Sequence, residues 1–287
     1  MDVGQIGKRR HRFDDLAFRC DRCGIGFSNS RSPTSRRRIF RDPEDNVPPE
    51  VRDGVTAALD GAANVRNRAS KRFKFGSSRS EDALTWTMFE GLRKAGRLDA
   101  VLPPAARGLE TGRPPTVLAW GHPVAGSDGE RIADALSVIS NRLGEKVSSR
   151  SEPDLILAWP HLVVFVEVKL DSANDSQPGH RRFSMYLNPA ADLYSNPAAV
   201  ATAGFYELTR NWTIAGALAA HLGCSMMLIN LGPGAVGHSA EGFSSLLRQN
   251  DRRRFVFRTW NDVVRAAAPL PRWLEVYLDG VALERSD

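Results

Sequence analysis

Two apolar, β-branched runs meet at a proline between Ser151 and Leu170, where the chain reads SEPDLILAWPHLVVFVEVKL. Proline favours a turn, so we expect an antiparallel hairpin about a two-residue turn at Pro160-His161. In that register Asp154 lies directly opposite Glu167, and facing residues have Cβ atoms about 4.5–5.5 Å apart. Side chains alternate along a strand, which places Lys169 on the same face as Glu167.

Two carboxylates and an amine are therefore expected at one end of a hairpin that is otherwise apolar. Facing acidic residues repel each other, so the pair requires a counter-charge, which a divalent cation would supply. Mg²⁺ takes oxygen ligands and commonly uses only one or two protein carboxylates. The alternative is an ordinary edge hairpin with its charges at frayed ends.

The residues Pro153-Asp154 and Glu167-Val168-Lys169 resemble the signature of the PD-(D/E)xK nuclease superfamily, which has the restriction-endonuclease-like fold. The resemblance covers about residues 77–260. It implies an α/β domain with a mixed central sheet flanked by helices. It also implies that Asp154 and Glu167 hold Mg²⁺, which Mn²⁺ could replace, with the carbonyl of Val168 as a candidate third ligand. Lys169 would orient and activate the attacking water.

A helix is predicted from Glu81 to about Ala95, with Ser80 as its N-cap. Glu81 lies three residues before Leu84 and therefore on the buried stripe of this helix. In the resembled superfamily the first core helix often carries a glutamate that reaches the metal, and Glu81 occupies that place. The alternative is that Glu81 only complements the helix dipole.

A second long helix is predicted over Pro197–Leu222, followed by a buried strand over Ser225–Leu231. In many members of the resembled superfamily this crossover helix carries a polar residue near the metal. Glu207 and Arg210 are the candidates, since they share one face of the helix. The alternative is a surface ion pair worth a few tenths of a kcal/mol.

Basic residues near the hairpin are candidate phosphate contacts, although each could equally be an ordinary surface residue. Arg150 ends a predicted strand over Lys146–Arg150, just before the acidic pair. A long polar segment over Asp171–Asn196, predicted as a loop, leaves the end of the catalytic strand. It contains His180, Arg181 and Arg182.

The remaining predicted elements complete an α/β domain over residues 77–287. Apolar patterning and turn residues predict two further strands and three further helices: strands over Thr116–Trp120 and Phe255–Thr259, and helices over Gly129–Leu143, Trp260–Ala267 and Leu270–Leu278.

The positive charge is concentrated in the N-terminal quarter. Residues 1–79 hold 18 Lys/Arg against 10 Asp/Glu, a net charge of +8, and the remaining residues hold 21 against 23, a net charge of −2. Residues 1–76 are predicted to form a poorly ordered basic arm, largely irregular apart from a short helix over Pro49–Leu59. Such an arm is typical of nucleic-acid binding, and a solvated tail is the alternative.

Three cysteines among 287 residues do not make a disulfide framework, and a reducing, cytoplasmic location is the default expectation. Cys20 and Cys23 form a single C-x-x-C motif, but zinc needs four ligands. His11 could add only a third, so zinc is not expected and two surface thiols are the simpler interpretation. There is no apolar run of the ~20 residues that span a bilayer, and no secretory h-region is seen.

Other classes of enzyme lack their motifs. The sequence has no G-x-S-x-G elbow and no P-loop or dinucleotide-binding fingerprint. The resemblance to the PD-(D/E)xK superfamily therefore leads us to expect a Mg²⁺-dependent nuclease, acting on DNA by in-line attack of water held on the metal. Restriction is the first choice of process and DNA repair or recombination the second. The alternative is a non-catalytic nucleic-acid-binding or adaptor protein. Double-strand cutting with one site per chain would suggest two copies, so a homodimer is among the expected assemblies.

Overall fold

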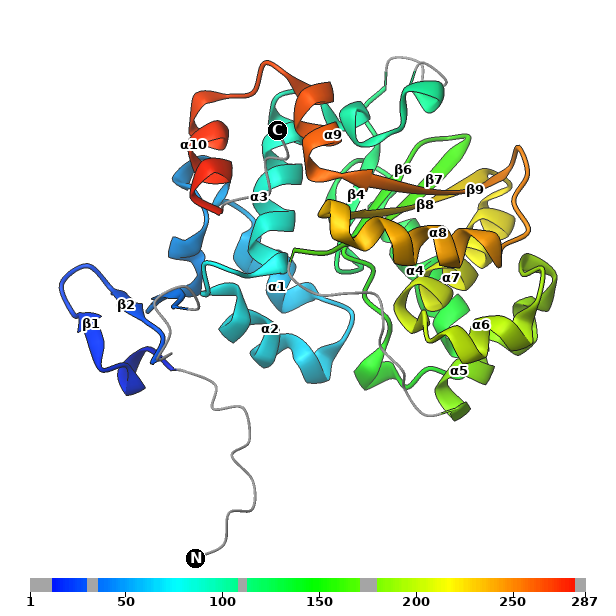
Figure 1. The fold of residues 1–287 in the computed structure, drawn as a ribbon, viewed down its shortest axis with the longest axis horizontal. Coiled ribbons are helices and arrows are strands. Elements are labelled where there is room, and N and C mark those ends of the chain that lie inside the picture. Colours follow the sequence, from blue (N-terminus) through cyan, green and yellow to red (C-terminus); the bar gives the residue numbers. More distant parts are fainter. Residues whose placement is uncertain (1–11, 30–35, 108–112, 171–179, 282–287) are drawn as a thin grey trace, which may run out of the picture.

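A mixed six-stranded sheet forms the centre of the molecule in the computed structural model, which describes residues 12–29, 36–107, 113–170 and 180–281. The strands lie in the order β5-β4-β6-β7-β8-β9 (Figure 1). Neighbouring strands are antiparallel from β5 to β7 and parallel from β7 to β9. Their bounds are β4 Thr116–Ala119, β5 His122–Ala125, β6 Leu155–Ala158, β7 Leu162–Val168, β8 Ser225–Gly232 and β9 Arg253–Thr259.

The hairpin β6–β7 has the predicted register. Leu155 pairs with Val166 and Ala158 with Val163. The amide of Trp159 donates to the carbonyl of Leu162 at 2.8 Å, which closes a two-residue turn at Pro160-His161. One step beyond Leu155 and Val166, this register sets Asp154 opposite Glu167. The turn proline therefore decides which residues meet at the other end of the hairpin.

Helices cover both faces of the sheet, so each face buries its own apolar core (Figure 1). One face packs against α4 (Gly129–Arg142), α5 (His180–Leu187), α6 (Pro197–Ala203), α7 (Tyr206–Leu222) and α8 (Gly237–Ser245). The other packs against α3 (Glu81–Lys94), α9 (Trp260–Ala267) and α10 (Arg272–Val281). The predicted mixed sheet flanked by helices is thus confirmed as an architecture.

The chain between β7 and β8 differs from its prediction. The expected helix over Pro197–Leu222 is interrupted at Gly204, whose φ of +82° ends α6 before α7 begins. The expected loop over Asp171–Asn196 contains α5, because Phe183, Tyr186 and Leu187 are buried against the sheet face. The expected strand over Lys146–Arg150 is wrong, since Val147–Ser149 form a 3-10 turn.

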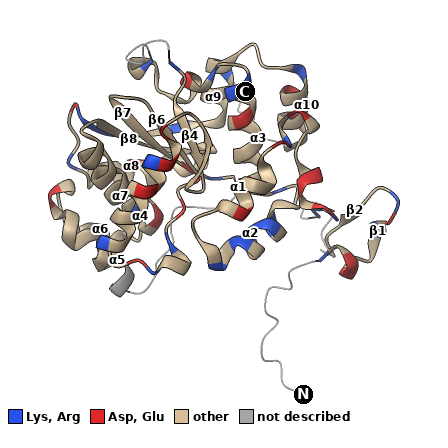
Figure 2. Ribbon diagram, turned by 180° about the vertical axis from the view of Figure 1, so that it is seen from behind, with Lys and Arg blue, Asp and Glu red and all other residues tan. Residues whose placement is uncertain are grey.

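The expectation of a largely irregular arm over residues 1–76 is wrong for most of the part that the structure describes, which contains short strands as well as helices. The helix expected over Pro49–Leu59 is split at Gly54 (φ +81°), and only α1 (Val55–Gly61) is α-helical. A second helix, α2 (Arg68–Phe75), follows and is lined by basic residues (Figure 2). Apolar residues of this segment form a third core with Trp86 of α3 and with Trp120.

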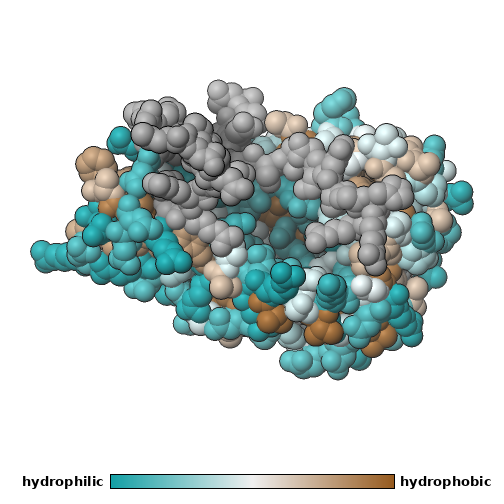
Figure 3. Space-filling model, turned by 90° about the horizontal axis from the view of Figure 1, so that it is seen from below, coloured by the Kyte–Doolittle hydropathy of each residue, from teal (hydrophilic) through white to brown (hydrophobic). Residues whose placement is uncertain are grey.

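A separate three-stranded sheet, which we call the N-terminal sheet, precedes this segment. It comprises β1 (Phe18–Cys20), β2 (Ile25–Phe27) and β3 (Arg38–Phe40), all antiparallel. Most of the molecular face drawn in Figure 3 is hydrophilic, with scattered hydrophobic spots. Among the described residues, none of the helices is both long and apolar enough to cross a membrane.

Candidate active site

The polar end of the hairpin faces α7. Ile156 and Phe165 belong to the core beneath α7, and alternation along the strands puts Asp154, Glu167 and Lys169 on that same face. Asp154 Oδ2 accepts a hydrogen bond from the backbone N–H of Val168 at 2.7 Å. The side chain of Asp154 therefore reaches across to β7, as the predicted register requires.

Lys169 bridges two carboxylates. Its Nζ donates to Glu167 Oε1 at 2.8 Å and to Glu207 Oε2 at 2.7 Å. Only 4% of Glu167 and 5% of Lys169 is exposed. An ion pair removed from water in this way is favourable only when its remaining lone pairs and protons are satisfied, and Glu207 supplies the second acceptor for the ammonium.

Two asparagines that the sequence did not single out hold Glu167. Asn211 of α7 donates from Nδ2 to Glu167 Oε2 at 2.6 Å, and Asn230 of β8 donates to the Glu167 carbonyl at 3.3 Å. Both asparagines are fully buried. An amide inside an otherwise apolar helix–strand contact is the signal that could have identified them, because a buried polar group needs a partner.

Glu81 links the first core helix to the backbone that follows β7. Ser80 caps α3 as predicted, accepting from the amide of Ala83. Glu81, in the first turn, accepts at Oε1 from the backbone N–H of Leu170 at 2.8 Å. The structure thus brings Glu81 and Glu207 to the hairpin end from two different helices.

The environment separates the pKa values of the two facing carboxyls. Burial, followed by repulsion from Glu167, raises the pKa of Asp154 well above its usual range. Burial also acts to raise the pKa of Glu167, but Lys169 and Arg210 outweigh it and the net pKa is lowered. Burial acts to lower the pKa of Lys169, yet the surrounding carboxylates raise it above the ordinary lysine value. The environment therefore favours the charged form of Lys169 and of Glu167 and the neutral form of Asp154.

These side chains line one cleft of about 780 Å³. Asp154, Glu167, Lys169, Glu81 and Glu207 all border it. Tyr186 forms part of its wall and donates to the buried carboxylate of Glu145 at 2.5 Å. A cleft lined by carboxylates with shifted pKa values is a common setting for catalysis.

The candidate phosphate contacts separate into three groups. Arg210 lines the cleft, 3.9 Å from Glu167 Oε2 and above the ring of Tyr206. Arg150 also lines it, but its guanidinium donates to Ser137 and Asn141 of α4. The side chains of His180, Arg181 and Arg182 lie outside the described part of the structure.

The N-terminal segment contributes Lys71 from α2, which sequence reasoning missed. Its ammonium lies 2.9 Å from Asp82 of α3 and 3.5 Å from Glu152, and over the ring of Trp120. Because Glu152 precedes Asp154 by two residues, Lys71 fastens α2 to the start of the catalytic hairpin. The residue is 6% exposed, and no single-helix pattern reveals a partner that far along the chain.

The donor set at the hairpin end fits a hard divalent cation. Among the described residues there is no group of three or more His, Cys, Asp or Glu side chains placed to hold a metal, but Mg²⁺ does not need three. Both oxygens of Glu167 already accept hydrogen bonds, and each keeps a further lone pair. The N–H of Val168 points toward Asp154, and in an extended strand the carbonyl of the same residue points to the same side.

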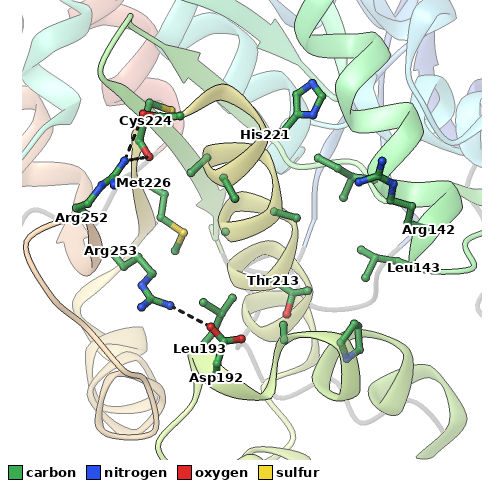
Figure 4. A pocket seen from close by; sticks show the side chains of 18 of the residues that line it. Arg142, Leu143, Asp192, Leu193, Thr213, His221, Cys224, Met226, Arg252 and Arg253 are labelled. Atoms are coloured by element: carbon green, nitrogen blue, oxygen red, sulfur yellow. Dashed lines mark hydrogen bonds and ion pairs between the residues drawn. The ribbon is translucent and has the colours of Figure 1, made fainter.

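A larger groove of about 870 Å³ lies at the opposite end of the parallel strands, around Cys224 and Met226 (Figure 4). Arg252 donates to the backbone carbonyls of Gly223 and Cys224, and Arg253 pairs with Asp192 at 3.6 Å. Arg252 and Arg253 are thus used within the fold, and the groove lacks the facing carboxylates of the smaller cleft.

Cys20 and Cys23 are exposed free thiols. Hydrogen bonds, first from the backbone of Cys23, lower the pKa of Cys20. His11, the candidate third zinc ligand, lies outside the described residues.

No protein-family model matches this chain, and neither a curated protein nor a solved structure matches it significantly.

Proposed function

We propose that the protein is a metal-dependent nuclease of the PD-(D/E)xK type that hydrolyses phosphodiester bonds in DNA. The observation that carries the proposal is Asp154 set opposite Glu167, with Lys169 held on Glu167, in an open cleft. Asp154, Glu167 and the carbonyl of Val168 would hold Mg²⁺ or Mn²⁺. When bound, the cation would lower the pKa of a water molecule and polarise the phosphoryl oxygen.

Residues of this chain have the remaining roles in the proposed reaction. Lys169 stays protonated, so it donates hydrogen bonds and offsets negative charge that develops on the phosphate, and does not accept a proton. Asn211 and Arg210 keep Glu167 ionised and oriented. Glu81 holds the backbone that follows Lys169. Restriction of foreign DNA is our first choice of process, and DNA repair or recombination the second.

A non-catalytic nucleic-acid-binding or adaptor protein is the second candidate. One observation favours it: Lys169 and both oxygens of Glu167 are already engaged with other side chains. A chain that had lost catalysis could keep these bonds for stability. The intact set of Asp154, Glu167 and Lys169 favours the nuclease, because an inactive protein has no chemical need for all three.

Plasmid and linear DNA incubated with Mg²⁺, Mn²⁺ or EDTA separate the two candidates. We expect cleavage with either cation, none in EDTA, and none by Asp154→Asn or Lys169→Ala. The exposed residues Asp128 and Lys94 provide matched controls, and Asp128→Asn and Lys94→Ala should cleave as wild type does. Cleavage that persists in EDTA or in both site variants contradicts a metal-dependent nuclease that acts through this cleft. Binding without cleavage under every cation supports the adaptor.

A further inference from the structure

The N-terminal sheet exposes two aromatic rings side by side. Phe18 of β1 pairs in register with Phe27 of β2, and their exposed fractions are 64% and 46%. Residues directly opposite each other lie on one face of a sheet, so the two rings form a single patch. Figure 1 shows β1 and β2 at one end of the molecule, away from the six-stranded sheet.

Arginines border this aromatic pair. Arg38 of β3 is the register partner of Phe27 and continues the row across the same face, with its guanidinium beside Gly280 of α10. The guanidinium of Arg36 lies over the ring of Phe18, 5.8 Å from its centroid. Over the described residues 12–29 and 36–41, seven arginines stand against three aspartates, a net charge of +4. The patch therefore combines flat apolar rings with a positive border.

The opposite face of the sheet is closed. Gly26 lies so near Leu16 that a Cβ on the glycine would come within 2.5 Å of Leu16 Cδ1, and Leu16 is 1% exposed. The sheet thus buries one face on its own N-terminal turn and leaves the aromatic face outward. Large exposed apolar patches with a polar border commonly mark interaction sites.

We propose that the face carrying Phe18, Phe27, Arg36 and Arg38 binds single-stranded nucleic acid, with unstacked bases on the rings and phosphates on the guanidinium groups. Charge complementarity selects a polyanion over an apolar protein surface. The exposed rings select single strands over duplex, because the bases of a duplex are stacked on one another, whereas unpaired bases stack on aromatic side chains without regard to sequence. The face is separate from the proposed catalytic cleft, and it would hold substrate or product strands near the enzyme.

The test is fluorescence anisotropy of a short labelled oligothymidylate, with the full chain in EDTA so that binding is measured without cleavage. Stacking contributes about 1–3 kcal/mol per base. Phe18→Ala and Phe27→Ala should therefore each weaken binding by about 5-fold to 150-fold. Val138→Ala, which truncates an exposed apolar residue on α4 (43% exposed), should leave affinity unchanged. Phe18→Tyr should retain affinity, and Phe18→Leu should lose it.

Several outcomes would overturn the proposal. Unchanged affinity in both alanine variants would show that the two rings do not contact the oligonucleotide. Equal affinity of the Phe18→Leu and Phe18→Tyr variants would show that bases do not stack on the ring of Phe18. Tighter binding of a matched duplex, unaffected by Phe18→Ala, would show that the charges alone act. A wild-type dimer in sedimentation that becomes monomeric in Phe18→Ala would assign the face to a second copy of this chain. All of these results are independent of whether the cleft cleaves DNA.

Discussion

Asp154 lies opposite Glu167 across the hairpin, and its Oδ2 accepts a hydrogen bond from Val168, the residue after Glu167, at 2.7 Å. The pairing brings two carboxyl groups to one edge of the cleft, where burial and repulsion from Glu167 raise the pKa of Asp154 while Lys169 and Arg210 lower the pKa of Glu167. A divalent cation bound there would offset the repulsion between the two carboxyl groups.

Asp154→Asn should stabilise the metal-free protein at neutral pH. The pKa of Asp154 is higher in the folded chain than in the unfolded chain, so the folded state binds more protons between those two values and the free energy of unfolding falls as pH rises through them. Asparagine does not ionise, so the free energy of unfolding of the variant does not fall in this way as the pH rises. We expect thermal unfolding in EDTA to occur a few degrees higher in the variant, since ~1 kcal/mol shifts Tm by about 2–4 °C. The difference should vanish below the usual aspartate pKa range. A difference that is independent of pH would contradict this origin.

Lys169→Met should destabilise the fold. It leaves Glu167 and Glu207 without their ammonium, and breaking a buried ion pair costs about 3–5 kcal/mol. Urea unfolding measures the cost. Arg131→Met breaks the exposed pair with Asp128 and should cost less than about 1 kcal/mol. The double variant Lys169→Met/Glu167→Gln should recover part of the stability. If the single and double variants are equally unstable, Lys169 is not neutralising Glu167.

Asn211→Ala should lower kcat/KM for DNA cleavage by about 10-fold to 100-fold, the usual cost of removing a residue that orients a metal ligand. The N–H of Asn211 favours the ionised form of Glu167 and helps to lower its pKa. Without it the acid limb of the pH–rate profile should move to higher pH. Asn211→Asp should cost more, because it places a further carboxylate against Glu167. A profile that falls in height without moving would indicate a purely structural role.

Lys71→Met should loosen the N-terminal segment from the catalytic hairpin. Asp82 and Glu152 would lose a largely buried partner, at a cost of about 3–5 kcal/mol. Arg72→Met, on the same helix but with a side chain 39% exposed, is the matched control and should cost about 1 kcal/mol or less. Urea unfolding compares them. If both variants lose the same free energy of unfolding, Lys71 does not hold α2 to the hairpin.

The hairpin could be predicted because its register depends on local residues. A proline fixes the turn, and side-chain alternation then determines which residues face each other. The helix beginning at Glu81 and the strand over Ser225–Leu231 were predictable for the same reason: the cap, the apolar period and the ending glycine lie within one short window. The catalytic candidates Asp154, Glu167, Lys169, Glu81 and Glu207 therefore meet as the sequence suggested.

The wrong predictions concern segments whose structure depends on packing against residues that are distant in the sequence. The apolar spacing of Pro197–Leu222 continues through Gly204, so only the backbone reveals the break. Residues 1–76 were expected to be largely irregular because polar stretches such as Asp42-Pro43-Glu44-Asp45 break the apolar period, yet Val51, Val55 and Phe75 are buried with Trp86 and Trp120. Lys71 and Asn211 acquire their partners from other elements, which a single sequence does not identify.

Titration of Mn²⁺ into the protein, followed by the electron paramagnetic resonance signal of the free ion, tests the central claim most directly. The account predicts a bound ion in the wild type that is lost in Asp154→Asn and in Glu167→Gln and retained in the surface control Asp128→Asn. Binding that is equal in the wild type and both site variants, or absent from all of them, would contradict a metal site built on Asp154 and Glu167.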